Sequence, residues 1–207
     1  MTEFMDGVTW FRHSSVRIRR SDVEIHVDPW GVAETGKADF ILLTHPHYDN
    51  FSEEDISSVR SDETIVVAPS SMRKQLGDVD HLLHPGDLIQ LSRIDILAVP
   101  AYNRDRKFHP ADSGWLGYVF TVGGVTYFHA GHTDPLESMS GIRCDVALIP
   151  CCTDYTMGPE EAAGVAELCG ASVLVPLHWD DNPYGLAEVE KIPDIFSGTV
   201  AILERTT

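Results

Sequence analysis

The sequence predicts an α/β fold, arranged in layers within one domain that spans residues 1–207. Two observations predict this fold class and the single domain. Apolar runs of strand length at 40–43, 64–68 and 145–150 are each followed by a segment with a helix start signal. Such an alternation of strands and helices is typical of layered α/β folds. The chain length of 207 residues suits a single domain with a sizeable core.

The first half of the chain alternates strands with two helices. We expect short strands at 8–11, 16–19 and 24–27, the second because apolar and basic residues alternate in it. Ser52, with an acidic residue three positions later, predicts a helix over 52–60. Pro69 and Gly77 bound a shorter helix after the strand at 64–68. His81 and His84 then lie in a linker and are expected to be surface residues.

The second half follows the same alternation. A strand is predicted at 94–100, and alternating runs at 117–122 and 125–129 flank Gly123 and Gly124, which predicts a hairpin. The buried strand at 145–150 leads to a helix over 157–169 with Pro159 in its first turn. We expect a strand at 173–179, a helix over 186–196 that is interrupted at Pro193, and a last strand at 200–203.

Composition excludes several partner classes. The formal net charge is −17, which argues against nucleic acid and against anionic membranes, because both are bound by clustered Lys and Arg. No apolar run has transmembrane length and no signal peptide is indicated, so we expect a cytoplasmic protein with a small-molecule substrate. The four cysteines have no disulfide or CxxC spacing and are expected to be reduced. The role of Cys151 and Cys152 and a homo-oligomeric state stay open.

The segment 44–50, Thr-His-Pro-His-Tyr-Asp-Asn, carries the strongest chemical signal. It lies between the strand at 40–43 and the helix start at Ser52, where α/β sheets place ligands. Imidazole and carboxylate are ligands of first-row metals. His45 and His47, two residues apart at a strand end, can bind one metal, and Asp49 can reach a neighbouring one. A surface loop with two solvated histidines is the alternative.

This segment resembles the first motif of the metallo-β-lactamase superfamily, T-H-x-H-x-D-H, with Asn50 in place of the last His. The chain is similar to a branch that contains L-ascorbate-6-phosphate lactonase-like proteins and uncharacterised metal-dependent hydrolases. The resemblance runs from about Trp10 to Trp179 and implies a four-layer αββα sandwich. It also implies a metal site assembled from several strand ends.

Three further histidines fall within altered family motifs. Asn103 occupies the usual His position after the strand at 94–100. His109, in the same loop, is the candidate for the missing nitrogen ligand, and a residue that only caps the loop is the alternative. His132 stands where the family has a metal-bridging Asp, and a neutral imidazole has one free lone pair and cannot bridge. His178 matches the His of the family's closing motif.

Other residues are expected to line or support the site. His13 belongs to a turn that resembles a Gly-His-Ala-Ser turn of the superfamily, with Arg12 in place of Gly; a purely structural turn is equally compatible. Asp28 is expected to support the first His ligands, or else to form a simple turn. The cationic residues Arg104, Arg106 and Lys107 suggest binding of an anionic substrate, with a solvated loop face as the alternative.

The altered motifs give two readings of function. The first is a metal-dependent hydrolase that uses metal-activated water on a small anionic ester, lactone or phosphoester, with Asp49 or Asp134 as the proton acceptor. The second is a degenerate member that binds a ligand, metal or partner without turnover. Zinc suits so many imidazoles, with Mn, Fe or Ni as alternatives, and one metal is favoured over two because Asp49 is the only carboxylate among the expected ligands.

Overall fold

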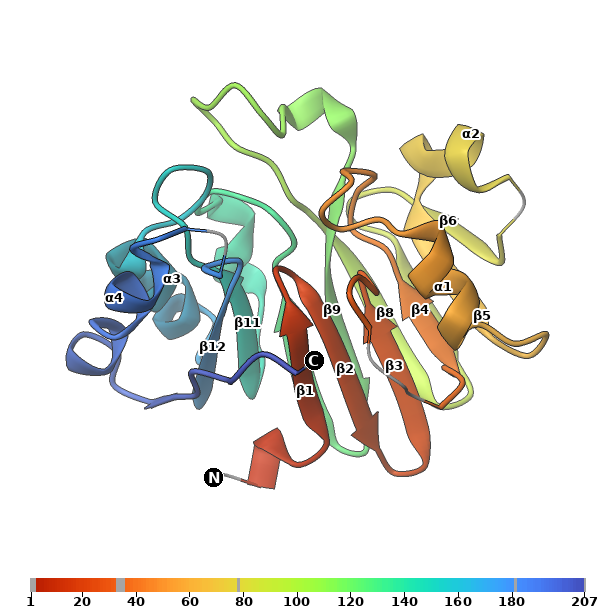
Figure 1. Cartoon of the computed structure of the whole chain (residues 1–207), viewed down its shortest axis with the longest axis horizontal. Helices are drawn as coiled ribbons and strands as arrows, with labels where there is room; N and C mark the ends of the chain where they lie inside the picture. Colours follow the sequence, from red (N-terminus) through yellow and green to blue (C-terminus); the bar gives the residue numbers. More distant parts are fainter. Residues whose placement is uncertain (1–2, 33–35, 78, 181, 207) are drawn as a thin grey trace.

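Two mixed β-sheets packed face to face form the centre of the structure, a computed structural model that describes residues 3–32, 36–77, 79–180 and 182–206 (Figure 1). One sheet has the order β1-β2-β3-β4-β5-β6 and the other the order β13-β12-β11-β10-β9-β8-β7. The first contains β1 (Val8–Arg12), β2 (Ser15–Arg20), β3 (Val23–Val27), β4 (Phe40–Leu42), β5 (Ile65–Pro69) and β6 (His81–Leu83). The second contains β7 (Leu88–Leu91), β8 (Ile94–Pro100), β9 (Leu116–Val122), β10 (Val125–His129), β11 (Val146–Pro150), β12 (Val173–Leu177) and β13 (Thr199–Val200).

Helices cover the outer face of each sheet. On the first sheet lie α1 (Glu53–Val59), the 3-10 turn η2 (Ser70–Met72) and α2 (Arg73–Leu76). On the second lie η4 (Glu137–Gly141), α3 (Pro159–Leu168), α4 (Gly185–Val189) and η5 (Ile192–Asp194). Two further 3-10 turns are η1 (Glu3–Met5) and η3 (Ala111–Ser113). No helix among the described residues is long and apolar enough to span a membrane.

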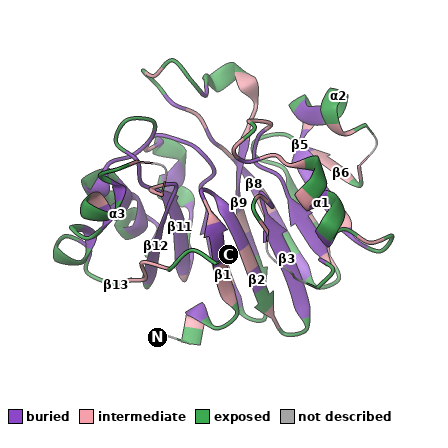
Figure 2. Cartoon of the chain, viewed as in Figure 1, coloured by how far each residue is buried: buried purple, intermediate pink, exposed green. Residues whose placement is uncertain are grey.

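Three apolar clusters correspond to the interfaces between the four layers. The largest lies between the sheets and includes Trp10, Ile25, Phe120 and Tyr127. A second joins the outer face of the second sheet to α3, η4 and η5, and a third joins the first sheet to α1 and η2. Figure 2 shows the buried strands at the centre and the exposed outer faces of the helices. The αββα sandwich implied by the resemblance is therefore confirmed.

Local sequence signals account for most of these elements. The Ser52 side chain caps α1 by accepting a hydrogen bond from the Asp55 backbone N–H at 3.1 Å, as the start signal predicted. Gly123 and Gly124 both have positive φ, which the tight turn between β9 and β10 requires. Pro193 lies in η5, and the helix predicted over 186–196 is split into α4 and η5.

The sequence missed two strands of the structure. His81 lies at the start of β6, a three-residue edge strand, and not in a linker. The strand β7 alternates exposed and half-buried residues at the edge of the other sheet, so it has no continuous apolar run. The predicted strand at 200–203 is only partly formed, because the regular pairing of β13 covers Thr199 and Val200. These differences lie at sheet edges, away from the candidate site.

Four hydrogen bonds join the two sheets at one edge. The Tyr118 hydroxyl donates to the Leu43 carbonyl at 2.6 Å, and the Leu116 N–H donates to the Thr44 carbonyl at 3.1 Å. The His178 N–H donates to the His13 carbonyl at 3.0 Å, and Nε2 of His129 lies 2.9 Å from the Ser14 carbonyl. The ends of β1, β4, β9, β10 and β12 therefore meet at this edge.

Candidate metal centre

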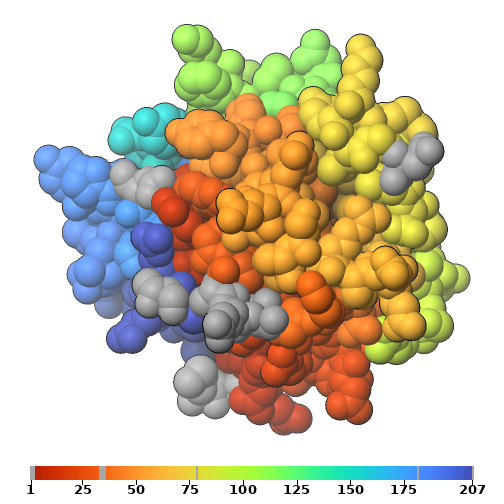
Figure 3. All heavy atoms as spheres, turned by 45° about the vertical axis from the view of Figure 1, so that its right-hand side comes forward, coloured from red at the N-terminus to blue at the C-terminus, as the bar shows by residue number. Residues whose placement is uncertain are grey.

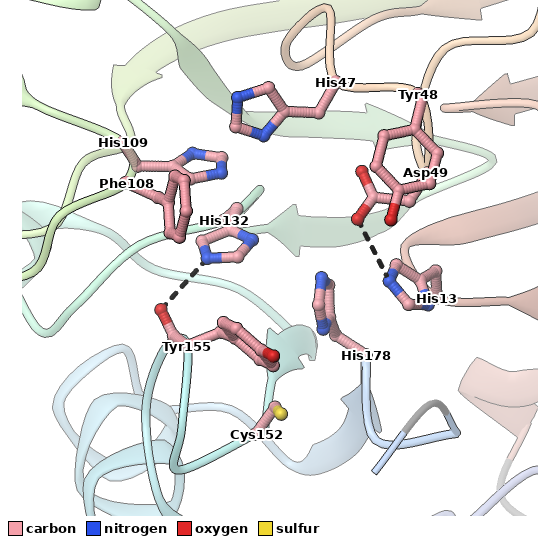
Figure 4. Close-up of a pocket in the computed structure, with 10 residues that line it drawn as sticks. All are labelled: His13, His47, Tyr48, Asp49, Phe108, His109, His132, Cys152, Tyr155 and His178. Atoms are coloured by element: carbon pink, nitrogen blue, oxygen red, sulfur yellow. Dashed lines mark hydrogen bonds and ion pairs between the residues drawn. The ribbon is translucent and has the colours of Figure 1, made fainter.

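A cavity of about 510 Å³ lies at the edge where the two sheets meet (Figure 4). Its walls come from the β1–β2 turn, the loop after β4, the loop after β8, the segment after β10, the loop after β11 and the end of β12. The lining residues are His13, His47, Tyr48, Asp49, Phe108, His109, His132, Cys152, Tyr155 and His178. Segments far apart in the chain thus contribute imidazoles to one space.

His45, His47 and His109 form the first cluster of candidate ligands. One ring nitrogen of each lies within 4.8 Å of those of the other two. His45 follows the buried strand β4 and is 1% exposed, and its Nε2 has no hydrogen-bond partner among the described residues. A buried nitrogen without a partner costs about 1–3 kcal/mol, so a cation at this point would relieve the cost. The cluster therefore fits a first-row divalent metal.

A relay of hydrogen bonds fixes the His45 ring. Nδ1 of His45 lies 2.7 Å from the Thr44 hydroxyl, which donates to Oδ2 of the buried Asp28 at 2.5 Å. The Thr44 N–H donates to the other carboxylate oxygen at 2.7 Å. When Asp28 is ionised, the Thr44 hydroxyl accepts a hydrogen bond from the Nδ1–H of His45, which leaves the Nε2 lone pair directed at the cluster. Asp28 thus lies where the sequence placed it, behind the ligand.

Asn103 anchors the loop that carries His109. Its side-chain amide donates to the carbonyls of Phe108 at 3.1 Å and Tyr155 at 3.0 Å, and its backbone N–H donates to the His109 carbonyl at 2.7 Å. Asn103 is not among the cavity-lining residues. It holds His109 in place, and His109 supplies the third nitrogen of the cluster.

A second cluster lies on the other side of the cavity. His13, Asp49 and His178 also present ligand atoms within 4.8 Å of one another. Nε2 of His13 is 3.4 Å from Oδ2 of Asp49, and the rings of His13 and His178 lie 3.9 Å apart between centroids (Figure 4). His13 was expected to line the site, and the structure places it there.

His132 lies between the two clusters but joins neither of them. Its ring stacks on that of His109, with centroids 3.6 Å apart, and its Nε2 lies 3.1 Å from the Tyr155 carbonyl. Gly131 before it has a φ of 70°, and a Cβ there would come within 2.7 Å of the Leu116 carbonyl oxygen. The position that the resemblance assigns to a bridging carboxylate is therefore held by a ring whose Nε2 points at backbone.

Backbone strain is concentrated at this site. Six described residues other than glycine have positive φ, and four of them are His13, Asp28, His109 and His178. The other two, Ser21 and Asp22, form the β2–β3 turn. Such conformations cost about 1–3 kcal/mol each and persist where the surrounding structure enforces them. The fold therefore holds three cavity histidines in conformations that an unconstrained chain disfavours.

Five imidazoles of the site have a lowered pKa, which favours the neutral form that metal ligation requires: His45, His47, His109, His132 and His178. Burial lowers the pKa of His109 to about 3 and that of His178 to about 4. Burial also lowers the pKa of His45 and His132, and neighbouring imidazoles add to the effect. For Asp49, burial alone would raise the pKa, but contacts with His13, Asn50 and His178 lower it. The site thus combines these five imidazoles with one carboxylate, that of Asp49.

The remaining predicted residues lie behind the cavity wall or outside it. Asp134 accepts hydrogen bonds from the Arg104 N–H at 2.9 Å and from Nε of Arg106 at 3.1 Å. Arg106 also donates to the carbonyls of Thr153 and Thr156. Arg104 is exposed, and Lys107 lies over the Phe108 ring. None of these residues lines the cavity, so the structure gives them an anchoring or surface role.

Sequence reasoning missed the aromatic rim of the cavity. Tyr48, Phe108 and Tyr155 line it and are respectively 84%, 51% and 52% exposed. Large exposed aromatic side chains around a cavity are a signal of binding, but that exposure appears only in three dimensions. Cys152 also lines the cavity, and all four cysteines are free and buried, as expected for reduced thiols.

Two facing sheets with imidazoles and a carboxylate gathered at one edge define a metal-binding protein of the αββα class. A sequence profile described as the Beta-lactamase superfamily domain matches residues 7–178. A UPF0173 metal-dependent hydrolase of Geobacillus sp. (strain WCH70) is 31% identical over 201 residues, covering 85% of this chain and 86% of the relative. The chain therefore belongs to the β-lactamase superfamily, in the UPF0173 family whose members are named metal-dependent hydrolases.

Solved structures agree with this assignment. A metal-dependent hydrolase from Parabacteroides distasonis ATCC 8503 has a TM-score of 0.86 and 30% identity, covering 96% of this chain and 93% of that one. Igni18, a metallo hydrolase from the archaeon Ignicoccus hospitalis KIN4/I, has a TM-score of 0.79 and 21% identity, with coverages of 97% and 95%. The second likeness shows the fold alone.

Proposed function

We propose that the protein is a metal-dependent hydrolase of a small ester, lactone or phosphoester. The observation that carries this proposal is the cluster of His45, His47 and His109 around the unpaired Nε2 of a buried imidazole. Three neutral imidazoles with an open position are a ligand set of catalytic zinc. Zinc is the metal we propose, with Mn, Fe or Ni as alternatives.

We assign a separate role to the imidazoles, to Asp49 and to the aromatic side chains of the cavity. A divalent metal held by these imidazoles supplies a Lewis acid and lowers the pKa of water. Asp49, ionised and facing the cavity, is the proton acceptor we propose, since Asp134 is held by Arg104 and Arg106 outside it. Tyr48, Phe108 and Tyr155 form an apolar rim that orients a substrate and excludes water. The arginines give no support for an anionic substrate.

A substrate screen of zinc-loaded and manganese-loaded protein tests this function. Aryl esters, lactones and phosphodiesters would be assayed beside the His47→Asn variant, which removes one imidazole of the cluster. We expect turnover of at least one class and a loss in the variant larger than the about 10–100-fold that changing an outer-shell partner of a metal ligand costs.

The second candidate function is a degenerate protein that binds a ligand without turnover. His132 favours it, because this residue stands where the family motif has a carboxylate, and its Nε2 points at the Tyr155 carbonyl. Saturable binding of product-like ligands with no hydrolysis of any class, by protein that retains its metal, would replace the first proposal by the second. Equal turnover in the wild type and the His47→Asn variant would exclude the metal-dependent mechanism.

A further inference from the structure

One side-chain amide connects two of the three aromatic residues at the rim of the cavity. Nδ2 of Asn103 donates hydrogen bonds to the Phe108 carbonyl at 3.1 Å and to the Tyr155 carbonyl at 3.0 Å. Asn103 is 3% exposed and lies shortly after β8, so the second sheet fixes its position. The loops after β8 and β11 are therefore joined at the two residues that carry these rings.

Tyr155 and Phe108 combine a fixed backbone with an exposed ring. The Tyr155 N–H donates to the Cys152 carbonyl at 2.9 Å, and the Tyr155 carbonyl lies 3.1 Å from Nε2 of His132. Tyr155 is nevertheless 52% exposed and Phe108 51% exposed. Aromatic side chains lose little conformational entropy on binding, because few torsions remain to be fixed. These two rings are therefore prepared to bind an apolar group without a rearrangement of the loops.

Tyr48 presents a third ring on the other side of the cavity. In Figure 4 its side chain lies across the group of imidazoles from that of Phe108, and it is 84% exposed. The cavity of about 510 Å³ has a volume typical of small-molecule sites. A substrate whose reacting bond lies among the imidazoles would thus place its remaining atoms against the aromatic rings. Exposed aromatic surface of this kind is suited to a flat apolar ligand.

The lining of the cavity offers no positive side chain to a charged group at the rim. Among the described residues it includes no Lys or Arg, and its only carboxylate is that of Asp49. Lys107 lies outside, with its Nζ 5.4 Å from the centroid of the Phe108 ring. An anionic group at the rim would lose its hydration, would face Asp49, and would approach a chain with a formal net charge of −17. An uncharged group avoids all of these costs.

We propose that Tyr48, Phe108 and Tyr155 bind a flat, uncharged apolar group of the substrate, such as an aryl ring, beside the reacting bond. The inference rests on the proposed function and narrows its substrate to an ester or lactone that carries such a group. It replaces the anionic group that the cationic residues of segment 104–107 suggested. Aromatic rings pack favourably in edge-to-face or offset arrangements, so each of the three rings adds to the affinity.

Binding of two naphthalene probes tests the charge of this group without an activity assay. The full-length protein would be treated with a chelator, so that no metal can bind the carboxylate of a probe, and equilibrium dialysis would measure the affinity. We expect uncharged 2-naphthamide to bind at least about tenfold more tightly than 2-naphthoate, which has the same ring system and a negative charge. Equal affinities, tighter binding of 2-naphthoate, or no binding of 2-naphthamide would overturn the proposal.

Substitutions at the rim test which residues bind the ring. Tyr48→Ala, Phe108→Ala and Tyr155→Ala should each weaken the binding of 2-naphthamide by about tenfold. Phe108→Tyr and Tyr155→Phe keep a ring at each position and should restore most of the affinity. Tyr184→Ala is the matched control, because Tyr184 is 73% exposed and does not line the cavity, and it should bind like the wild type. Wild-type affinity in all three alanine variants, shown by circular dichroism to be folded, would contradict the assignment.

Ester hydrolysis by zinc-loaded protein tests the same group as part of a substrate. Methyl 2-naphthylacetate and methyl acetate share the methyl ester and differ in the aryl group. We expect kcat/KM to be at least about tenfold higher for the naphthyl ester, through a lower KM, because the ring lies away from the reacting bond. Phe108→Ala should remove most of this advantage by raising KM at an unchanged kcat.

The outcomes separate this inference from the proposed function. Selective binding of 2-naphthamide without hydrolysis of any ester or lactone would retain the aromatic site and remove the hydrolase. Hydrolysis of both methyl esters with equal kcat/KM would retain the hydrolase and overturn the aromatic site.

Discussion

The Thr44 hydroxyl lies 2.7 Å from Nδ1 of His45 and connects that ring to the buried carboxylate of Asp28. The group between the His45 ring and the Asp28 carboxylate is therefore the Thr44 hydroxyl. It has one proton, so it can donate to only one of the two neighbours and must accept from the other. With Asp28 ionised, every donor in the relay has an acceptor, and the metal-facing nitrogen keeps its lone pair. His45 is thus prepared for ligation by residues that do not line the cavity.

Thr44→Val should weaken zinc binding at the first cluster by about 10–100-fold, the usual effect of removing the partner of a metal-binding histidine. Valine has the shape of threonine but cannot donate to Asp28 or accept from His45. Competition with a chromophoric chelator measures the affinity. Thr44→Ser, which keeps the hydroxyl, is the control and should bind zinc close to the wild-type affinity. Equal affinities for the Val and Ser variants would contradict the relay.

Zinc affinity should rise with pH because of Asp28. Burial raises the pKa of Asp28 to about 8, although its hydrogen bonds with Thr44 oppose the shift. The neutral form of Asp28 is therefore well populated in metal-free protein at neutral pH, and loss of its proton makes the carboxylate a stronger acceptor for the Thr44 hydroxyl. We expect Asp28 to add up to about tenfold in affinity per pH unit below pH 8, and nothing above it. Asp28→Asn should lack this component, measured by the same competition between pH 6 and 9.

Asn103→Asp should loosen the loop that carries His109. The aspartate has the size of asparagine but no amide donor, so the carbonyls of Phe108 and Tyr155 lose their partner. We expect a loss of about 1–3 kcal/mol in the free energy of unfolding, together with weaker zinc binding. Urea denaturation of metal-free protein measures the first effect. Unchanged stability would show that the loop is held by other contacts.

Arg106→Ala should act on stability, because Arg106 bonds to Asp134 and to the carbonyls of Thr153 and Thr156. We expect a decrease of about 2–4 °C in Tm for a loss of about 1 kcal/mol. Arg104→Ala is the comparison, since that side chain is exposed, and should leave Tm unchanged. If Arg106 binds substrate instead, its removal would raise KM at an unchanged Tm, which thermal melts and kinetics would separate.

Tyr118→Phe should test the junction between the sheets. The Tyr118 hydroxyl is buried and donates to the Leu43 carbonyl just before the metal loop. Its removal leaves that carbonyl without its donor, and we expect a cost of about 1–3 kcal/mol in unfolding free energy. Tyr184→Phe, on an exposed tyrosine, is the matched control. A similar small effect of both changes would mean that the junction does not depend on this bond.

Sequence alone predicted the parts of the site that depend on local signals. His45, His47 and His178 each follow an apolar strand, and the ends of such strands collect at one edge of a sheet. The division into two clusters could not be predicted in this way. It depends on the β1–β2 turn meeting the end of β12, a contact between residues far apart in the chain. The role of Asn103 in anchoring the His109 loop could not be predicted either, because the carbonyls that accept its hydrogen bonds lie in two separate loops.

The fold also divides into elements that local sequence signals predict and elements that they do not. Buried strands and the capped helix α1 follow from apolar runs and from Ser52, whereas β6 and β7 lack such runs because they are sheet edges. The packed face of the molecule in Figure 3 gives a further example. Residues from the N-terminal part of the chain, in red to yellow, form most of that face, an arrangement that hydrophobic patterning predicts only as layers and not as neighbours.

The positive φ angles of His13, His109 and His178 have a consequence for protein engineering. Glycine adopts a positive φ without the steric cost that other residues have, so glycine at a strained position would relieve about 1–3 kcal/mol. In this protein the strained positions are histidines that line the cavity. A selection of variants for thermal stability alone would therefore favour the loss of these histidines. Selection for heat resistance should therefore favour glycine at these three positions, and selection for metal binding should favour histidine.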